Sequence, residues 1–212
     1  MPNDFVAMDP EALSSSQVYD LLVGAIQPRP IAFVSTISAD GILNLAPFSF
    51  FTAGGTQPPS LVISITRSSR GEKDSLTNIQ ESGQFVVNTV LRTMAEGMNV
   101  TSANFERSDS EWPFSGLTPL PSLKVAPPRV AESPIQMECV LKEVVRHGEE
   151  AGSARYVIGE VVEFHIDRRF FIDENAHLDD LGLISRLGGP NYLDSATGER
   201  FHMDRPTTPG GK

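Results

Sequence analysis

The chain has 212 residues, 40% of them hydrophobic and 21% charged, and its formal net charge is −10. This length and composition predict one globular domain with a sizeable core and exclude a disordered chain. So acidic a surface argues against binding to nucleic acid or to an anionic membrane. We expect a single domain over residues 1–203 and a disordered tail over residues 204–212, which are rich in proline and glycine.

The sequence shows no segment that would direct the protein to a membrane or out of the cell. Its N-terminus has neither the basic start nor the apolar run of a signal peptide, and no apolar run is long enough to cross a bilayer. The single cysteine, Cys139, lies in an apolar run, so we expect a buried residue that acts as a small hydrophobe. We therefore expect a cytoplasmic protein.

The first elements predicted along the chain are a helix and a hairpin. Residues 11–24 have one apolar face and a run of serines suited to cap a helix, and Pro28 and Pro30 follow it. Residues 31–38 are rich in β-branched and aromatic side chains, which predicts a strand. Asp40-Gly41 then favours a tight turn, so we expect the next residues to pair back on this strand.

The middle of the chain alternates strands with short helices. Gly54-Gly55 and Pro58-Pro59 predict a loop. Beyond it, the pattern predicts a strand over 60–66, a helix over 73–82 that ends before Gly83, a strand over 84–90 and a helix over 94–104.

The later part of the chain begins with a long irregular segment. Residues 107–134 contain six prolines and no clear period, so we expect a surface excursion of one domain, because strands resume after it. Two long strands are predicted over 135–143 and 156–166, and one or two short helices over 168–184. This order disfavours the regular alternation of a Rossmann-type fold. We predict a mainly β fold with peripheral helices, built as an antiparallel barrel or sandwich.

Several well-known catalytic and binding motifs are absent. The sequence has no P-loop, no Gly-x-Gly-x-x-Gly after a predicted strand and no Gly-x-Ser-x-Gly elbow. None of the four histidines pairs with another at the spacing that a metal site on a helix or strand requires. We expect these histidines, including His165 in a predicted strand, to be structural or solvated.

A polar loop over residues 66–78 is the first candidate site. It follows a predicted apolar strand, leads into a predicted helix, and combines Arg67, Arg70 and Lys73 with several hydroxyl groups. The N-terminus of a helix offers free N–H groups, and a guanidinium group fits phosphate oxygens. In an acidic protein this basic loop indicates a phosphate site. A solvated polar loop is an equally good interpretation of the residues alone.

Two further segments have the composition of a ligand site. Residues 44–51 place a proline and a serine among three phenylalanines, which suits a flat ring with a polar edge. An ordinary strand with phenylalanines in the core is the stronger interpretation of this segment alone. Residues 185–192 combine an arginine and a tyrosine with paired glycines that permit close approach. A turn with a surface arginine is the stronger interpretation of these residues alone.

The ordered combination of these segments resembles the flavin-reductase-like family, whose members fold as FMN-binding split barrels with Greek-key-like topology. The resemblance covers about residues 15–195, and the order of its pieces is what makes it specific. The matching pieces are Arg29-Pro30-Ile31-Ala32-Phe33-Val34-Ser35-Thr36, Gly41, Asn44, Ala46-Pro47-Phe48-Ser49-Phe50-Phe51, Pro58-Pro59, Arg70, Lys73-Asp74, Thr77-Asn78-Ile79, Phe85-Val86-Val87-Asn88, Gly159-Glu160-Val161-Val162, Arg186-Leu187-Gly188-Gly189 and Tyr192. Where the family usually has Lys-Asp-Thr, this chain has Lys73-Asp74-Ser75, which keeps the hydroxyl group.

The resemblance implies a homodimer that holds FMN near the subunit interface, and it assigns expected roles by position. The expected contacts of the isoalloxazine ring are Asn44, Ala46, Pro47, Phe48 and Ser49. The candidates for contact with the phosphate and the ribityl chain are Thr66, Arg67, Arg70 and Lys73. Asp74 and Thr77 are expected to support that loop. Arg186 and Gly188 are expected to approach the flavin from the later segment.

The reaction implied by the resemblance belongs to the flavin. A reduced nicotinamide nucleotide, NADH or NADPH, would pass hydride to the flavin N5, and no side chain would have to act as a nucleophile. An FMN-binding carrier or sensor without reductase turnover is the main alternative. Binding of haem or another ring cofactor by a related split barrel is a third, and it would need a histidine beside an apolar pocket.

Overall fold

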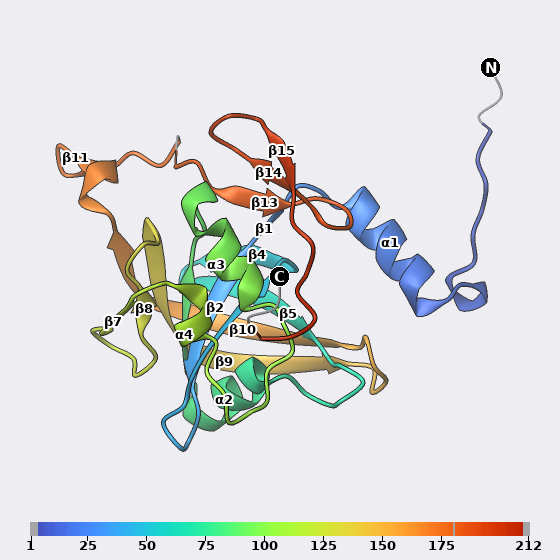
Figure 1. Ribbon diagram of the computed structural model, residues 1–212, viewed down its shortest axis with the longest axis horizontal. Coiled ribbons are helices and arrows are strands. Elements are labelled where there is room, and N and C mark those ends of the chain that lie inside the picture. Colours follow the sequence, from blue (N-terminus) through green and yellow to red (C-terminus); the bar gives the residue numbers. More distant parts are fainter. Residues whose placement is uncertain (1–3, 180, 210–212) are drawn as a thin grey trace.

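The computed structural model describes residues 4–179 and 181–209, and its main element is an antiparallel sheet whose strands run in the order β3-β2-β6-β9-β10-β5-β4 (Figure 1). The predicted mainly β fold with peripheral helices is confirmed. The strands of this sheet are β2 (Ala32–Ile37), β3 (Leu43–Phe48), β4 (Phe51–Thr56), β5 (Pro59–Thr66), β6 (Gln84–Asn88), β9 (Ile135–His147) and β10 (Ala154–Ile166).

A smaller sheet joins the beginning of the chain to its end. In this sheet Arg29 of β1 pairs with Arg186 of β13, which brings two segments of the resemblance side by side. Its strands are β1 (Arg29–Pro30), β13 (Ile184–Arg186), β14 (Asn191–Asp194) and β15 (Arg200–His202). Two short strand pairs lie outside both sheets: β7 (Pro119–Leu120) pairs with β8 (Arg129–Val130), and β11 (Phe171–Ile172) pairs with β12 (Asn175–Ala176).

Local sequence signals mark the start of α1 and the end of α2. Ser14 and Gln17 form a capping box at the start of α1, and Gly83 ends α2 in the left-handed conformation with φ of 69°. The described helices are α1 (Ser15–Ala25), α2 (Asp74–Ser82), α3 (Ala95–Val100) and α4 (Trp112–Ser115), with 3₁₀ turns η1 (Pro10–Ala12), η2 (Arg92–Met94) and η3 (Arg168–Phe170). None of the helices in the described part of the chain is long and apolar enough to cross a membrane.

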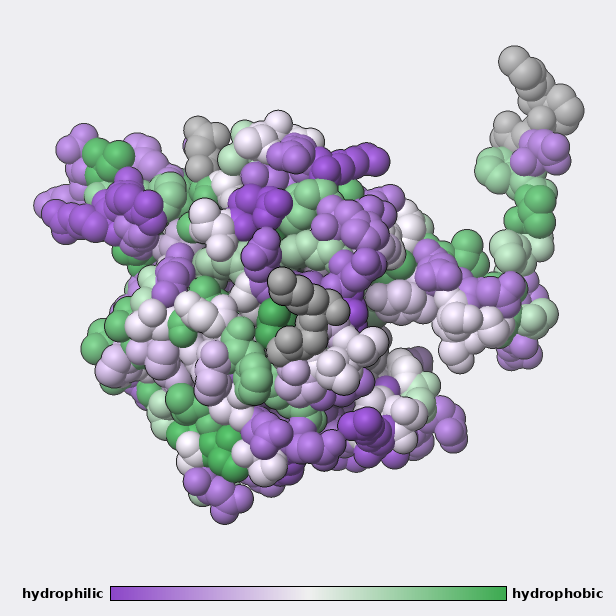
Figure 2. All heavy atoms as spheres, viewed as in Figure 1, coloured by the Kyte–Doolittle hydropathy of each residue, from purple (hydrophilic) through white to green (hydrophobic). Residues whose placement is uncertain are grey.

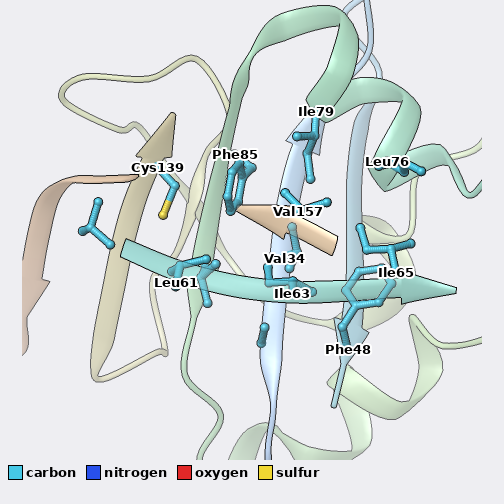
Figure 3. Packing of buried hydrophobic residues seen from close by; sticks show 13 residues of the cluster. Val34, Phe48, Leu61, Ile63, Ile65, Leu76, Ile79, Phe85, Cys139 and Val157 are labelled. Atoms are coloured by element: carbon cyan, nitrogen blue, oxygen red, sulfur yellow. The ribbon is translucent and has the colours of Figure 1, made fainter. Parts of the chain in front are cut away.

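Strand β2 is buried on both faces and separates two hydrophobic clusters. Val34 points into a cluster under α2, where Leu76 and Ile79 pack on the sheet (Figure 3). Phe33 points the opposite way, into a cluster that includes Trp112 of α4. Alternation of side chains along a strand produces this two-sided burial. Figure 3 also shows Cys139 in the first cluster, and its full burial confirms the expected structural role and raises the pKa of its thiol.

Some expected element boundaries are wrong. Gly54 and Gly55 lie in strand β4, and the turn follows at residues 57 and 58. A Cβ atom at Gly54 would lie 2.7 Å from Ser60 Oγ, so this glycine permits close approach of two strands. Of the one or two short helices expected over 168–184, the described residues 168–179 and 181–184 show one 3₁₀ turn, η3, followed by the β11-β12 hairpin and the start of β13. Helix α3 is shorter than predicted and β9 is longer, extending to His147.

A buried carboxylate, that of Glu138 in β9, holds part of the excursion over residues 107–134 to the barrel. Glu138 is fully buried and accepts hydrogen bonds from the backbone N–H groups of Leu123 at 2.8 Å, Lys124 at 2.6 Å and Val125 at 3.1 Å. His165 Nε2 lies 2.6 Å from the same carboxylate, so this histidine has a structural role. Burial would raise the pKa of Glu138, but these hydrogen bonds outweigh it and hold the pKa below its usual value.

Residues 4–14 and α1 form an arm that projects away from the barrel (Figure 1). Within α1 only Val23 is buried. On either side of the helix, Phe5 is 84% exposed, Val6 85% and Ile26 59%. Figure 2 shows apolar residues along this arm. An apolar surface of this kind, on a segment with few contacts to its own domain, is typical of an interface.

Candidate functional site

A cavity of about 280 Å³ lies where β3, the start of α2, the end of α3 and the small sheet meet. This volume lies just below the usual range for small-molecule pockets, which begins at roughly 300 Å³. Segments from residue 31 to residue 205 contribute to its wall. The cavity therefore depends on the tertiary fold and not on one local motif.

Strand β3 and its end form the first wall of the cavity, through Asn44 and residues 46–49. The Asn44 side chain is held at both ends. Its Oδ1 accepts hydrogen bonds from Ser75 Oγ at 2.7 Å and Thr36 Oγ1 at 3.1 Å, and its Nδ2 donates to Glu111. β3 is an edge strand of the large sheet as described, and on its outer side the N–H of Leu45 donates to Glu111 Oε2 at 2.9 Å. This wall presents a side-chain amide held by hydrogen bonds, a proline and an aromatic ring.

Lys73 supplies a cation at the start of α2. Its Nζ lies 5.4 Å from the centre of the Phe48 ring, and it lines the cavity as the residue before the first turn of the helix. No ion pair among the described residues includes Lys73. Burial, with a smaller effect from the positive charge of Arg205, lowers the pKa of Lys73. The lysine and the free N–H groups of the first turn form a site suited to an anion.

The loop before Lys73 is fixed by a buried arginine. Arg155 is 1% exposed and binds Glu72 Oε1 through Nε at 2.8 Å and the Gly148 carbonyl oxygen through Nη1 at 2.8 Å. Arg70, on the same loop, is exposed and lies 3.7 Å from Glu106. Asp74, the first residue of α2, accepts a hydrogen bond from Arg107 at 3.2 Å. Glu72 and Asp74 are therefore each paired with an arginine.

The small sheet forms the opposite wall with Arg186 and Tyr192. The guanidinium carbon of Arg186 lies 4.5 Å from the centre of the Tyr192 ring, and its Nη1 donates to the Tyr192 hydroxyl oxygen. Its Nη2 donates to the Gly189 carbonyl oxygen at 2.7 Å. Stacking and these two hydrogen bonds fix the arginine at the edge of the cavity.

The cavity brings together most of the residues predicted for the site, from all three candidate segments. Four of the predicted residues lie outside its wall. Thr66 pairs with Ala154 in the sheet, and the backbone of Arg67 binds the β9-β10 turn at Ser153 and Gly152. Thr77 lies one turn into α2, and Gly188 follows β13. The predicted residues in the wall are Asn44, Ala46, Pro47, Phe48, Ser49, Arg70, Lys73, Asp74 and Arg186.

Comparison with known proteins assigns the chain to a family. The model of the family described as flavin reductase like domain matches residues 25–178. The chain belongs to the flavin reductase-like family. It is 40% identical over 203 residues to an uncharacterized protein of Halalkalibacterium halodurans, covering 94% of this chain and 96% of that one. It is 36% identical over 201 residues to protein YwrF of Bacillus subtilis, covering 93% and 97%.

Solved structures of this family have the same fold. Component B of nitrilotriacetate monooxygenase from Bacillus cereus is 34% identical, with a TM-score of 0.86 over 95% of this chain and 100% of that chain. The 2-nitrobenzoate 2-nitroreductase of Pseudomonas fluorescens is 32% identical, with a TM-score of 0.79 over 95% and 97%. The expected split-barrel fold is confirmed, and family membership supports a flavin-related oxidoreductase activity.

Several residues that line the cavity were not expected from the sequence. Glu111 reaches it from the excursion, residues 101–105 from the segment after α3, and Arg205 from the predicted tail. Arg205 Nε donates to the Ser102 carbonyl oxygen at 2.8 Å, and Asn99 Nδ2 donates to the Asp204 carbonyl oxygen at 2.8 Å. The described residues hold no group of three metal-ligating side chains.

Proposed function

We propose that this protein binds FMN in the cavity and works as an NADH- or NADPH-dependent flavin reductase. The observation that carries the proposal is the meeting of three segments in one cavity: residues 44–49, Lys73 at the start of α2, and Arg186. An apolar wall with a few fixed polar groups and a free cation fits a flat ring that carries a phosphate.

The charge distribution of the cavity suits the phosphate of FMN. Glu72 and Asp74 are paired with Arg155 and Arg107, whereas Lys73 pairs with no carboxylate of the described chain. A doubly charged phosphate at the start of α2 would pair with Lys73 and accept hydrogen bonds from the free N–H groups of the helix. Arg70, on the exposed side, would add a weaker contact because solvent screens it.

The chain's own residues would bind and orient the ring. Phe48, Ala46 and Pro47 line the cavity and would supply apolar contacts, and backbone groups at the end of β3 would bind the polar edge. FMN would supply the redox chemistry by accepting hydride at N5 from a reduced nicotinamide. The absence of a nucleophile motif agrees with this division of labour, since the protein needs only to position the rings and tune their surroundings.

The test is a spectrum and a titration of the purified protein. The visible spectrum should show bound flavin, or FMN added to the apoprotein should bind with one site per chain. NADH or NADPH should then be oxidised in the presence of FMN. A colourless protein that fails to bind FMN would contradict the proposal. Gel filtration separates tightly bound flavin from flavin that exchanges as a substrate.

An FMN carrier or sensor is the second candidate, because the same cavity would serve it. Bound flavin with no oxidation of either nicotinamide nucleotide would favour this function. The two named structural relatives are a monooxygenase component and a nitroreductase, so both released reduced flavin and direct reduction of a nitroarene are worth assaying.

We also propose that the protein is a cytoplasmic homodimer in which the arm of one chain packs on the other. The exposed side chains of Leu21, Leu22 and Ile26 support this, since they have no cover in a single chain. Replacing Leu22 and Ile26 by glutamate should convert a dimer to a monomer in light scattering. Asp20→Asn, on the same helix, is the matched control. A wild-type protein with the mass of one chain would contradict the dimer.

A further inference from the structure

A carboxyl group lies in the wall of the cavity with no cation paired to it. Glu111 is 6% exposed and comes from the excursion, immediately before α4. One of its oxygens accepts a hydrogen bond from Asn44 Nδ2, and the other accepts from the N–H of Leu45 at 2.9 Å. None of the ion pairs formed within the described ranges includes Glu111. Neutral dipoles alone hold its negative charge.

Other charged groups share the cavity with Glu111. Asp74 at the start of α2 repels it, while β3 and the end of α3 contribute no titratable side chain to the wall. None of the histidines lines the cavity, so Glu111 is the group of this wall suited to change charge near neutral pH. The remaining charged residues of the wall are Arg70, Glu72 and Lys73 from the loop before α2, Arg186 from β13, and Arg205 after β15.

The protonation state of Glu111 is balanced near neutrality. The pKa of Glu111 is raised to about 7. Burial is the main cause, and the charge of Asp74 acts in the same direction, while the hydrogen bonds from Leu45 and Asn44 act in the opposite direction. A neutral carboxyl group has one O–H to donate, whereas a carboxylate only accepts. The polar edge of an isoalloxazine ring carries mainly acceptor atoms, so it complements the neutral form.

We propose that Glu111 takes up one proton from solvent when a flavin ring enters the cavity, and that its neutral carboxyl group donates a hydrogen bond to the ring. This inference rests on the proposed function. A ring over the carboxyl group excludes water, and loss of water disfavours the charged form. The bound state then holds the proton more tightly than the free state. Flavin binding is therefore strongest below about pH 7 and weakens as pH rises, by up to about tenfold per pH unit.

Calorimetric titration with riboflavin tests this inference without interference from a phosphate group, which itself titrates at about pH 6. Titrations in two buffers with different ionisation enthalpies give the number of protons taken up. We expect uptake of more than about half a proton at about pH 7.5 and almost none at about pH 5.5, where Glu111 of the free protein is already neutral. Glu111→Gln should abolish the uptake. Glu96→Gln, an exposed position on α3, is the control that should retain it.

The wild-type protein provides a second measurement, because a glutamine amide facing the N–H of Leu45 could disturb folding of the variant. A carbon-13 carboxyl signal should titrate near pH 7 in the free protein and shift to higher pH with riboflavin. Riboflavin binding with no proton uptake, or with proton release, would overturn the role of Glu111 and leave the proposed function intact. If neither riboflavin nor FMN binds, the proposed function is wrong and this inference with it.

Discussion

Replacing Lys73 by methionine is expected to weaken FMN binding by about 2 kcal/mol, roughly 30-fold, because a charge-assisted contact to phosphate is lost. Methionine keeps most of the apolar contact of the side chain with the Phe48 ring. Replacing Arg70 by alanine should cost less than about 1 kcal/mol, since its side chain is 71% exposed and solvent screens its charge. Fluorescence titration of the apoprotein with FMN measures both losses.

Riboflavin separates a phosphate contact from general damage to the cavity. It lacks the phosphate, so its affinity should be nearly unchanged in Lys73→Met. Lys142→Met, a surface lysine of β9 that pairs with Glu160, is the matched control and should bind both ligands normally. An equal loss of FMN and riboflavin affinity would contradict a contact between Lys73 and the phosphate.

Replacing Glu138 by alanine should destabilise the protein by about 3 kcal/mol or more. The change leaves three backbone N–H groups of the excursion without their acceptor, and unsatisfied buried donors are costly. Urea unfolding followed by circular dichroism measures the loss. Glu143→Ala, an exposed position on the same strand, should change stability by less than about 0.5 kcal/mol.

The contribution of Glu138 to the stability of the folded state should depend on pH. Its pKa is lower in the folded state than the unfolded value of about 4.3, so its stabilisation is fully present above that pH. It is lost as pH falls through the folded pKa. The stability difference between the wild type and Glu138→Gln should therefore shrink below about pH 4.

Limited proteolysis gives an independent measure of the same contact. Lys124 lies in the segment that Glu138 holds, so trypsin should cleave there faster in Glu138→Ala. Unchanged cleavage together with unchanged stability would mean that the rest of the excursion holds itself in place.

The sequence was sufficient for elements with a strong local pattern. The helix that ends at Gly83 and the paired strands around Asp40-Gly41 follow from periodicity and turn chemistry. The loop predicted at Gly54 was wrong because the sequence does not distinguish a glycine in a loop from a glycine at a close contact between strands. The hairpin of β11 and β12 was missed because strands of two residues are too short to show a period.

The candidate site was predictable where one segment supplies several residues in succession. Residues 44–49 and Lys73 lie in such segments. Glu111 could not be found, since it is separated from Asn44 by 67 positions and lies in an excursion with no regular pattern. Arg205 was missed because a segment rich in proline and glycine resembles a tail, although its neighbour Asp204 hydrogen-bonds to Asn99 of α3.

The path of the chain around the cavity has a consequence for the order of events during synthesis. The wall begins at Ile31 and is completed only by Arg205, so almost the whole polypeptide must leave the ribosome before a ligand can be enclosed. Cofactor capture would then be the last step of maturation, and a chain that ends before Arg205 would not retain colour. Because a ligand bound only to the native state stabilises it by mass action, flavin should raise the melting temperature of the entire chain in one cooperative transition.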